Sequence, residues 1–395
     1  MRDTHKHVIP DEVAGLRILA AADCYSPSTS GGGERAAREV YRRMAAAGAE
    51  IRILSWLRGA PFSDSGVHIR RLRGLDLSRL AGGHCVLALD ALRATAQELR
   101  AFSPQVAHVI SFYHSASLPL ALLASRKRVP VVTTAQSGPP PDNWGIRGAV
   151  AHAFDAVVTR PVLRRSASLL PVSRAVAEYL ERQGADPARI QIICNGVDHK
   201  RFDLTRPNVE GPRPRIVVIR RLAAIKGPQF ALDAALELLE RGCAFNLLFI
   251  GDGQLRSELE TRVRKAHAED SIQFAGQIEQ VERCLSEAEI FVLPSLTEGL
   301  SLALLEAMSA GLLCVVSAIP PNLELIADGR NGLTFRPSDS GHLADVLARA
   351  LTDPALRSRL AKEAQRDSLA YSWDRMAAET ARALCVAAGR LPPNG

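Results

Sequence analysis

The stretch from Pro294 to Gly311 reads Pro-Ser-Leu-Thr-Glu-Gly-Leu-Ser-Leu-Ala-Leu-Leu-Glu-Ala-Met-Ser-Ala-Gly, and it follows a short apolar run. The apolar run predicts a buried strand that ends at Pro294, and the Leu- and Ala-rich part predicts a helix that begins near Ser301. Serine is a good N-cap residue. Such a helix presents free backbone N–H groups and its positive dipole end to an anion. The stretch therefore predicts an α/β fold with a candidate anion site.

The same alternation of apolar runs and amphipathic stretches continues through both halves of the chain. Alternation of this kind is typical of α/β proteins with parallel sheets. Helices are expected between the strands, for example over 34–47 and 87–101. The expected strands are 16–21, 50–54, 106–110, 129–133, 168–171, 190–193, 215–219, 246–250, 271–274, 290–293 and 314–317.

A linker is expected between the halves at 204–214, where three prolines and a glycine exclude a helix or a central strand. The expected fold class is α/β, with two doubly wound Rossmann-like domains that face a cleft, the usual ligand site of open α/β sheets. The expected parts are a polar extension (1–15), an N-terminal domain (16–204), a C-terminal domain (205–370) and a C-terminal segment (371–395).

Composition narrows the class of protein. Of the 395 residues, 47% are hydrophobic and 23% are charged, close to the average of soluble globular proteins. No apolar run approaches the roughly 18 residues that cross a bilayer, and residues 1–15 lack the apolar core of a secretory signal. The seven cysteines include no CxxC pair, which disfavours a disulfide framework and a structural zinc site. We therefore expect a cytoplasmic protein.

Positive charge is concentrated in the first half. Through Thr205 the chain has 27 Lys and Arg against 18 Asp and Glu, whereas the remainder has 22 against 24. A basic half favours an anionic partner such as lipid headgroups, a phosphorylated acceptor or nucleic acid. A solvated arginine-rich surface explains the charge equally well. No nucleic-acid recognition motif is present, so we expect no nucleic-acid partner. The arginines of this basic half that we single out are Arg35, Arg38, Arg42, Arg147, Arg160, Arg164 and Arg165.

Candidate binding residues lie in loops that follow the expected strands. Glu298 precedes the helix that starts near Ser301, and Glu306 lies about one and a half turns inside it. Two carboxylates beside an anion site suit a nucleotide sugar, because carboxylates accept hydrogen bonds from vicinal hydroxyls. Arg221 and Lys226 flank a strand-to-helix turn, where two cations can neutralise a diphosphate leaving group. The chain has no Asp-x-Asp, the usual metal handle on a diphosphate, so these cations are expected to replace a metal.

A glycine loop, Ser-Gly-Gly-Gly-Glu at 30–34, lies between the first expected strand and helix. Consecutive glycines let the backbone approach a ligand closely. The spacing is not GxGxxG, which disfavours a nicotinamide or flavin cofactor. A simple tight turn is the alternative interpretation.

Together these segments resemble the family-four glycosyltransferases, which are retaining enzymes of the GT-B architecture. The resemblance covers nearly the whole chain after about the first fifteen residues. An E-x7-E signature from Glu298 to Glu306 is its most specific part. The other matching segments are 31–34, 171–173, 195–198 with Phe202, 221–222 with 226–227, 251–253, and Glu324 with 331–332.

The resemblance implies retaining, metal-independent transfer of a sugar from a nucleotide sugar, of the UDP or GDP type, to an acceptor hydroxyl. The implied acceptor is a glycan, a lipid-linked molecule or a small molecule of bacterial glycan or glycolipid synthesis, and no cofactor is expected. The first domain would bind the acceptor and the second the donor. A C-terminal helix anchored by Trp373 would cross back onto the first domain. An anionic membrane surface, with the protein peripheral at its inner face, would suit the basic half.

The resemblance also assigns residues. Arg221 and Lys226 would carry the diphosphate, Glu298 would contact the hydroxyls of the sugar, and these three are the implied catalytic residues. Glu306 would bind the ribose hydroxyls. The remaining implied donor-binding residues are Gly32, Gly33, Ile278, Gly299, Leu300, Ser301 and Leu302.

The acceptor side is assigned to Gln136 and His114. Gln136 stands where many members of the family have a histidine, and glutamine supplies hydrogen bonds but no acid or base. Arg220 stands where the family commonly has glycine, which either crowds the phosphate turn or adds a cation. Pro320 and Pro321 replace a stretch that is often rich in glycine.

Two other functions are compatible with the same pattern. One is a nucleotide-sugar epimerase or a glycosyl phosphorylase of the same architecture, although an epimerase needs an additional set of acid and base groups that the sequence does not suggest. The other is an inactive nucleotide-sugar-binding scaffold, which the intact Glu298, Glu306, Arg221 and Lys226 disfavour.

Overall fold

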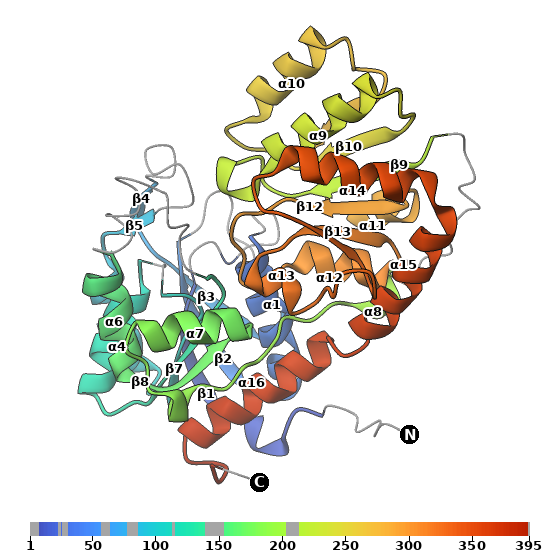
Figure 1. Cartoon of the computed structure of the whole chain (residues 1–395). Coiled ribbons are helices and arrows are strands. Elements are labelled where there is room, and N and C mark those ends of the chain that lie inside the picture. Colours follow the sequence, from blue (N-terminus) through green and yellow to red (C-terminus); the bar gives the residue numbers. More distant parts are fainter. Residues whose placement is uncertain are drawn as a thin grey trace, which may run out of the picture. The chain divides into compact units, whose positions relative to one another are not determined.

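The computed structural model describes residues 8–22, 25, 31–56, 64–76, 86–112, 115–138, 154–202 and 213–393 (Figure 1). The chain divides into two compact units, Met1–Gly196 with Trp373–Gly395, and Val197–Ser372. Val197 belongs to the second unit because its amide donates to the carbonyl of Tyr371 (3.4 Å). Apart from residues 213 and 214, the expected linker at 204–214 lies outside the described residues.

The first unit has a parallel sheet with the strand order β3-β2-β1-β6-β7-β8. The strands are β1 (Arg17–Ala21), β2 (Glu50–Ser55), β3 (Val67–Arg71), β6 (Val106–Val109), β7 (Val131–Ala135) and β8 (Ser166–Pro171). The helices are α1 (Gly32–Ala46), α3 (Ala91–Ala101), α4 (Ser117–Arg126), α6 (Arg160–Arg165) and α7 (Arg174–Arg182). All four residues of β6 and all five of β7 are buried, as expected for central strands of a sheet covered on both faces.

The second unit repeats this design with the order β11-β10-β9-β12-β13-β14. Its strands are β9 (Arg215–Ile219), β10 (Asn246–Ile250), β11 (Ile272–Gly276), β12 (Ile290–Leu293), β13 (Leu313–Ser317) and β14 (Leu333–Phe335). Its helices are α8 (His199–Phe202), α9 (Pro228–Glu240), α10 (Arg256–Lys265), α11 (Val281–Ser286), α12 (Leu302–Ser309), α13 (Pro320–Leu323), α14 (Ser340–Thr352) and α15 (Pro354–Ser368). The apolar core lies between sheet and helices and includes the stacked rings of Phe249 and Phe274, whose centroids are 4.9 Å apart.

Each sheet has a topological switch point, where the connections leave neighbouring strands in opposite directions. It lies between β1 and β6 in the first unit and between β9 and β12 in the second. Open α/β sheets bind their ligands beyond the carboxyl ends of the strands at such a point. The fold thus indicates one candidate location in each unit.

The C-terminal helix α16 (Trp373–Ala387) packs on α1 and on the strands of the first unit, which confirms the expected return crossing. The Trp373 side chain is buried, as an anchor requires. Arg43 of α1 donates to Asp374 of α16 at 2.8 Å. Beyond the helix, the Arg390 guanidinium donates to the carbonyls of Glu12, Ala14 and Gly15, which fixes the end of the described chain to the first unit.

Two expectations about local structure were wrong, and two edge strands were not expected. Residues 190–193 do not form a strand, although an isolated bridge joins Ile190 to Leu169 and the amides of Gln191 and Ile193 donate to carbonyls of β8. The helix expected over 87–101 begins at Ala91, because the preceding residues form strand β5 (Val86–Ala88) antiparallel to β4 (Gly74–Asp76). The edge strands β3 and β14 were not expected, since their short sequences carry a weak apolar signal. Within the described ranges, no helix is both long and apolar enough to span a membrane.

Candidate donor site at the switch point of the second unit

The candidate site is built from two loops at the carboxyl ends of β9 and β12. Arg220 and Arg221 directly follow β9, and Lys226 ends the short 3-10 helix η4 (Ala224–Lys226) before α9. Glu298 lies in the loop that connects β12 to α12. Because β9 and β12 are neighbours in the sheet, the two loops meet at the switch point.

The two loops are fixed against each other by their backbones. The amide of Leu296 donates to the carbonyl of Ile225 at 3.0 Å. Gly227 has φ +69°, and a Cβ at this position would overlap the carbonyl of Pro294. Only glycine combines this left-handed backbone with so close an approach. The cations and the carboxylate of the site are therefore carried by a rigid frame.

The carboxylate of Glu298 is surrounded by donors. Arg220 Nη2 and Ser295 Oγ each donate to Oε1 at 2.6 Å. Lys226 Nζ donates to Oε2 at 2.9 Å and to the carbonyl of Thr297 at 3.2 Å. Burial opposes ionisation, but the charges of Lys226 and Arg220 and the hydrogen bond from Ser295 outweigh it and lower the Glu298 pKa to about 2. Glu298 is therefore an anion at neutral pH.

The two cations of this cluster differ in accessibility. The side chain of Lys226 is 22% exposed, whereas that of Arg220 is 5% exposed. Burial lowers the pKa of both groups, and the Glu298 carboxylate opposes this effect in each case. The exposed Arg221 adds a third positive charge to the same turn. Two cations pair with one carboxylate and Arg221 adds a third positive charge nearby, so the cluster has an excess of positive charge, which suits an anionic ligand.

Helix α12 contributes its N-terminus beside Glu298. Ser301 is its N-cap, as expected, since its Oγ accepts the amide of Leu304 at 3.3 Å. Gly299 and Leu300 complete the loop before it. Glu306 is a buried residue of the same helix, about 7.5 Å along the axis from Ser301 at 1.5 Å per residue.

Buried hydroxyl and amide groups at the end of β13 and in α13 support the loop that carries Glu298. Ser317 at the end of β13 donates to the carbonyl of Ser295 at 2.6 Å. Asn322 Nδ2 donates to the carbonyl of Ser317 at 3.0 Å. Pro320 and Pro321 open α13, where proline at the first helical positions is favourable. The two prolines therefore fit a helix start beneath the site.

Sequence reasoning singled out Arg221, Lys226, Glu298 and the start of α12, and the structure places all of them at this switch point. Ile278 lies half-buried in the loop that follows β11. The sequence did not indicate how Glu298 would be held. The hydroxyl of Ser295 and the burial of the Arg220 guanidinium become apparent only from the fold. The sequence did mark Arg220 as unusual, because this arginine stands where the family commonly has glycine.

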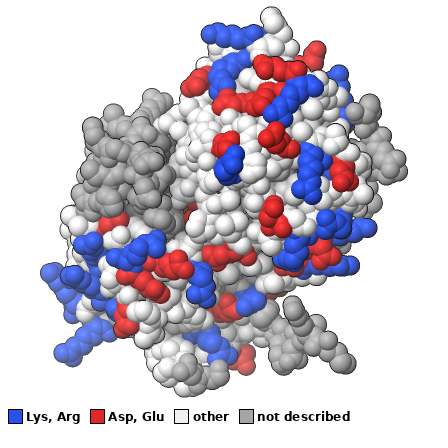
Figure 2. All heavy atoms as spheres, viewed as in Figure 1, with Lys and Arg blue, Asp and Glu red and all other residues white. Residues whose placement is uncertain are grey.

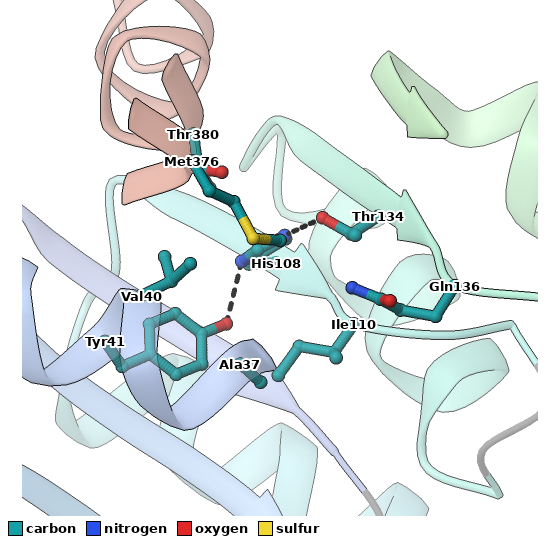
Figure 3. Close-up of a pocket in the computed structure, with 9 residues that line it drawn as sticks. All are labelled: Ala37, Val40, Tyr41, His108, Ile110, Thr134, Gln136, Met376 and Thr380. Carbon is teal, nitrogen blue, oxygen red and sulfur yellow. Dashed lines mark hydrogen bonds between the residues drawn. The ribbon is translucent and has the colours of Figure 1, made fainter. Parts of the chain in front are cut away.

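In the first unit, Gly32 and Gly33 form the first turn of α1. A Cβ on Gly33 would lie 3.3 Å from the side chain of Gln136, so the glycine loop and Gln136 are neighbours. Gln136 also lines a pocket shown in Figure 3, together with Ile110, Met376 and other residues of the first unit. His114 lies outside the described residues.

The same pocket contains a buried histidine that sequence reasoning missed. His108 Nδ1 lies 2.7 Å from the Tyr41 hydroxyl, and Nε2 lies 2.8 Å from Thr134 Oγ1 (Figure 3). Burial lowers the His108 pKa to about 3, so the ring is neutral at physiological pH. The available signal was a single histidine inside the apolar strand Val-Ala-His-Val.

Part of the expected basic face is neutralised by an acidic side chain. Arg38 and Arg42 of α1 pair with the buried Asp64 at 3.2 and 3.4 Å. The Tyr25 hydroxyl also donates to Asp64, at 2.9 Å. Among the described residues, no group of three or more His, Cys, Asp and Glu side chains could hold a metal ion.

Comparisons with known proteins cover both units. A family model described as Glycosyltransferase Family 4 matches residues 30–201, and one described as Glycosyl transferases group 1 matches 200–367. The glycogen synthase of Mycobacterium tuberculosis is 29% identical over 94% of this chain and 95% of its own. The amylovoran biosynthesis glycosyltransferase AmsK of Erwinia amylovora is 33% identical over 189 residues, 46% of each chain.

A solved structure gives the same result for the fold. The Anabaena protein HepE, in complex with UDP and glucose, superposes with a TM-score of 0.76 at 17% identity, covering 93% of this chain and 99% of that one. This likeness extends over both Rossmann-like units. The chain therefore belongs to the family-4 glycosyltransferases and has the GT-B fold.

Proposed function

We propose that this glycosyltransferase moves a sugar from a UDP- or GDP-sugar to an acceptor hydroxyl with retention at the anomeric carbon and without a metal ion. The observation that carries the proposal is the arrangement of Arg220, Lys226 and Glu298 beside the N-terminus of α12. Cations and a helix N-terminus stabilise the charge that develops on a diphosphate leaving group. In the proposed reaction they supply the stabilisation that a metal gives in other transferases.

The state of Glu298 favours a mechanism without a protein nucleophile. Retention through two displacements needs two carboxyl groups about 5 Å apart, one of them free to attack. Glu298 instead accepts hydrogen bonds from Arg220, Ser295 and Lys226. We therefore propose a front-face displacement, in which the departing phosphate oxygen takes the acceptor's proton. Glu298 then orients the site and holds hydroxyls of the donor sugar.

The relatives guide the choice of donor and acceptor. HepE binds UDP and glucose in its solved structure, and AmsK carries the description amylovoran biosynthesis. We propose a UDP-type donor as the first to test, with a GDP-type donor as the alternative. A glycan, a lipid-linked molecule or a small molecule in bacterial glycan synthesis is the proposed acceptor. Gln136 would lie on the acceptor side, and Gly32 and Gly33 would approach the phosphate of the donor or the acceptor.

A binding screen followed by product analysis tests the proposal. Thermal shift with UDP, GDP and ADP should give stabilisation by one of the first two, because a ligand raises stability in proportion to the logarithm of its concentration over Kd. The matching nucleotide sugar, incubated in EDTA, should then yield an α-linked product from an α-linked donor by NMR. Inverted product or complete loss of turnover in EDTA would contradict retention or metal independence, respectively.

Two controls separate the alternative functions. Incubation of the nucleotide sugar without acceptor should leave it unchanged, whereas an epimerase would convert it to a new nucleotide sugar. Addition of inorganic phosphate should release no sugar phosphate, which a phosphorylase would form. Binding without turnover over a panel of glycan and lipid acceptors would instead favour an inactive scaffold.

We further propose a cytoplasmic protein that lies peripherally on an anionic membrane surface. Arg160, Arg164 and Arg165 are exposed on α6, and Figure 2 shows basic side chains at the lower left, where α6 lies in Figure 1. Arg160 donates to Gln183 and Arg165 to a carbonyl, so neither contact neutralises its charge. Sedimentation with phosphatidylglycerol vesicles should show binding that salt weakens, and absence of binding would contradict this location.

A further inference from the structure

Arg220 is buried at the donor site in an arrangement that its own neighbours do not fully satisfy. Its Nη2 donates to Glu298, whereas Nε and Nη1 have no hydrogen-bond partner among the described residues. Buried N–H groups without a partner are costly and rare in proteins. A charged side chain retained under these conditions points to a function at the site.

The backbone of Arg220 is held firmly. Its amide donates to the carbonyl of Ile250 at 2.9 Å. Gly251, with φ +127°, approaches so closely that a Cβ there would overlap the Arg220 carbonyl. The guanidinium therefore extends toward Glu298 from a fixed point of the backbone.

The two cations on Glu298 occupy different oxygens. Arg220 and Ser295 share Oε1, whereas Lys226 alone contacts Oε2 among the donors described above. Lys226 is also the more accessible cation. If Lys226 were the sole counter-charge, turning its ammonium toward a phosphate would leave a buried carboxylate unpaired, which is strongly unfavourable. With Arg220 in place, Oε1 keeps its ion pair when Lys226 turns away.

We propose that Arg220 is a positioning residue that neutralises and holds Glu298, so that Lys226 is free to bind the diphosphate of the donor. The inference rests on the proposed function, because it takes the diphosphate as the ligand of Lys226. It assigns to a buried arginine a role in donor affinity that is exerted through Glu298 and not by contact with the ligand.

A double-mutant cycle tests the indirect action. Isothermal titration with UDP and GDP is carried out on wild type, Arg220→Met, Glu298→Gln and the double variant. Arg220→Met should weaken binding of the preferred diphosphate about tenfold, the equivalent of about one pKa unit of charge interaction. In the Glu298→Gln background the same change should cost less than about twofold, because the groups act as one unit. Equal losses in both backgrounds would overturn the proposal and indicate direct contact with the ligand.

Matched variants separate positioning from a general loss of charge. Arg215→Met removes an exposed arginine of β9 that pairs with Glu287 at 3.1 Å, and it should leave the affinity within about twofold of wild type. Arg220→Lys keeps a cation near Oε1 and should recover most of the affinity. Affinity for uridine, which lacks phosphate, should be the same in wild type and Arg220→Met. An equal loss for uridine would contradict the proposal.

A readout without ligand keeps the two proposals distinguishable. Carbon-13 NMR of the labelled Glu298 side chain should report a higher carboxyl pKa in Arg220→Met than in wild type, because one of its two counter-charges is gone. An unchanged pKa would overturn the positioning role whether or not a nucleotide binds. If wild type binds neither UDP nor GDP, the proposed donor is overturned instead. If Arg220→Met does not fold, Arg220→Gln takes its place in every measurement.

Discussion

The two units use the same strand order and place opposite chemistry at equivalent strands. Beyond β12 in the second unit, Glu298 is ionised and held by Arg220 and Lys226. On β6, the corresponding strand of the first unit, His108 is neutral and hydrogen-bonded on both ring nitrogens to Tyr41 and Thr134 (Figure 3). Both groups are polar and largely shielded from solvent, so the fold itself does not decide which kind of chemistry a switch point carries.

The difference shows that the two units of a GT-B chain can carry different kinds of polar group, charged in one and neutral in the other. Buried charges lose solvation, and they are kept where their field acts on a ligand. The second unit has an excess of cations beside Glu298, which suits the anionic leaving group of the proposed reaction. Beside its switch point, the first unit instead carries a neutral chain of hydrogen bonds that links α1, β6 and β7 in the pocket that Gln136 also lines. We therefore expect changes of charge to matter in the second unit and changes of packing to matter in the first.

Removal of the accessible cation should give the largest effect. Lys226→Ala should lower turnover about 10²- to 10³-fold, the usual result of losing one group that stabilises developing charge. The measurement is kcat with the nucleotide sugar found in the binding screen. Lys265→Ala, at the exposed end of α10, serves as the matched control and should leave kcat unchanged. If Lys226→Ala turns over nearly as fast as the control, the expectation that charge in the second unit determines activity is wrong.

The next largest effect concerns the frame of the charged site. Gly227→Ala forces a side chain into a left-handed backbone and into the Pro294 carbonyl. It should lower the free energy of unfolding by about 2–3 kcal/mol, the upper range for backbone strain. Gly242 also has a positive φ, +77°, but no atom lies within 4 Å of a Cβ added there. Gly242→Ala should therefore lower the free energy of unfolding by only about 1 kcal/mol. The stabilities of the two variants are compared by thermal unfolding followed by circular dichroism. Equal losses of stability would mean that the close contact between the loops after β9 and β12 is not required.

Sequence patterns predicted most of the fold because buried parallel strands have a strong local signal. The apolar runs of β9, β10 and β12 fixed their bounds to the residue. The short pair β4 and β5 was missed, since its exposed Leu75 and Leu87 face each other across the strands without entering the core. Ser301 before the Leu- and Ala-rich run likewise predicted the N-terminus of α12, because an N-cap is a local property.

What the sequence could not predict depends on contacts between distant residues. Arg220 and Glu298 are separated by 78 positions, and their ion pair exists only because β9 and β12 are neighbours in the sheet. The same holds for the contacts of His108 with Tyr41 and Thr134, which come from α1 and β7. A lone histidine in an apolar strand marks a buried polar group, but its partners follow from the topology alone.

The smallest expected effect is a pH dependence that separates the two regions. The His108 pKa is lowered from 6.5 to about 3, so in the range between these values the unfolded chain binds a proton that the folded chain does not. Stability therefore falls by about 1.4 kcal/mol for each pH unit below 6.5. Glu298, lowered from 4.5 to about 2, contributes stability that is lost only below pH 4.5. Of these two groups, only His108 should act between pH 7.5 and 5.5.

His108→Gln isolates this contribution, because glutamine keeps polar atoms near Tyr41 and Thr134 but does not titrate. Its deficit in unfolding free energy should shrink by about 1.4 kcal/mol between pH 7.5 and 5.5. Urea unfolding followed by tryptophan fluorescence is the measurement, since all three tryptophans belong to the first unit. His68→Gln, at an exposed position of β3, is the matched control for the replacement of a histidine by glutamine. A constant deficit for His108→Gln would mean that His108 accepts a proton within the fold, and the contrast between a charged and a neutral switch point would be lost.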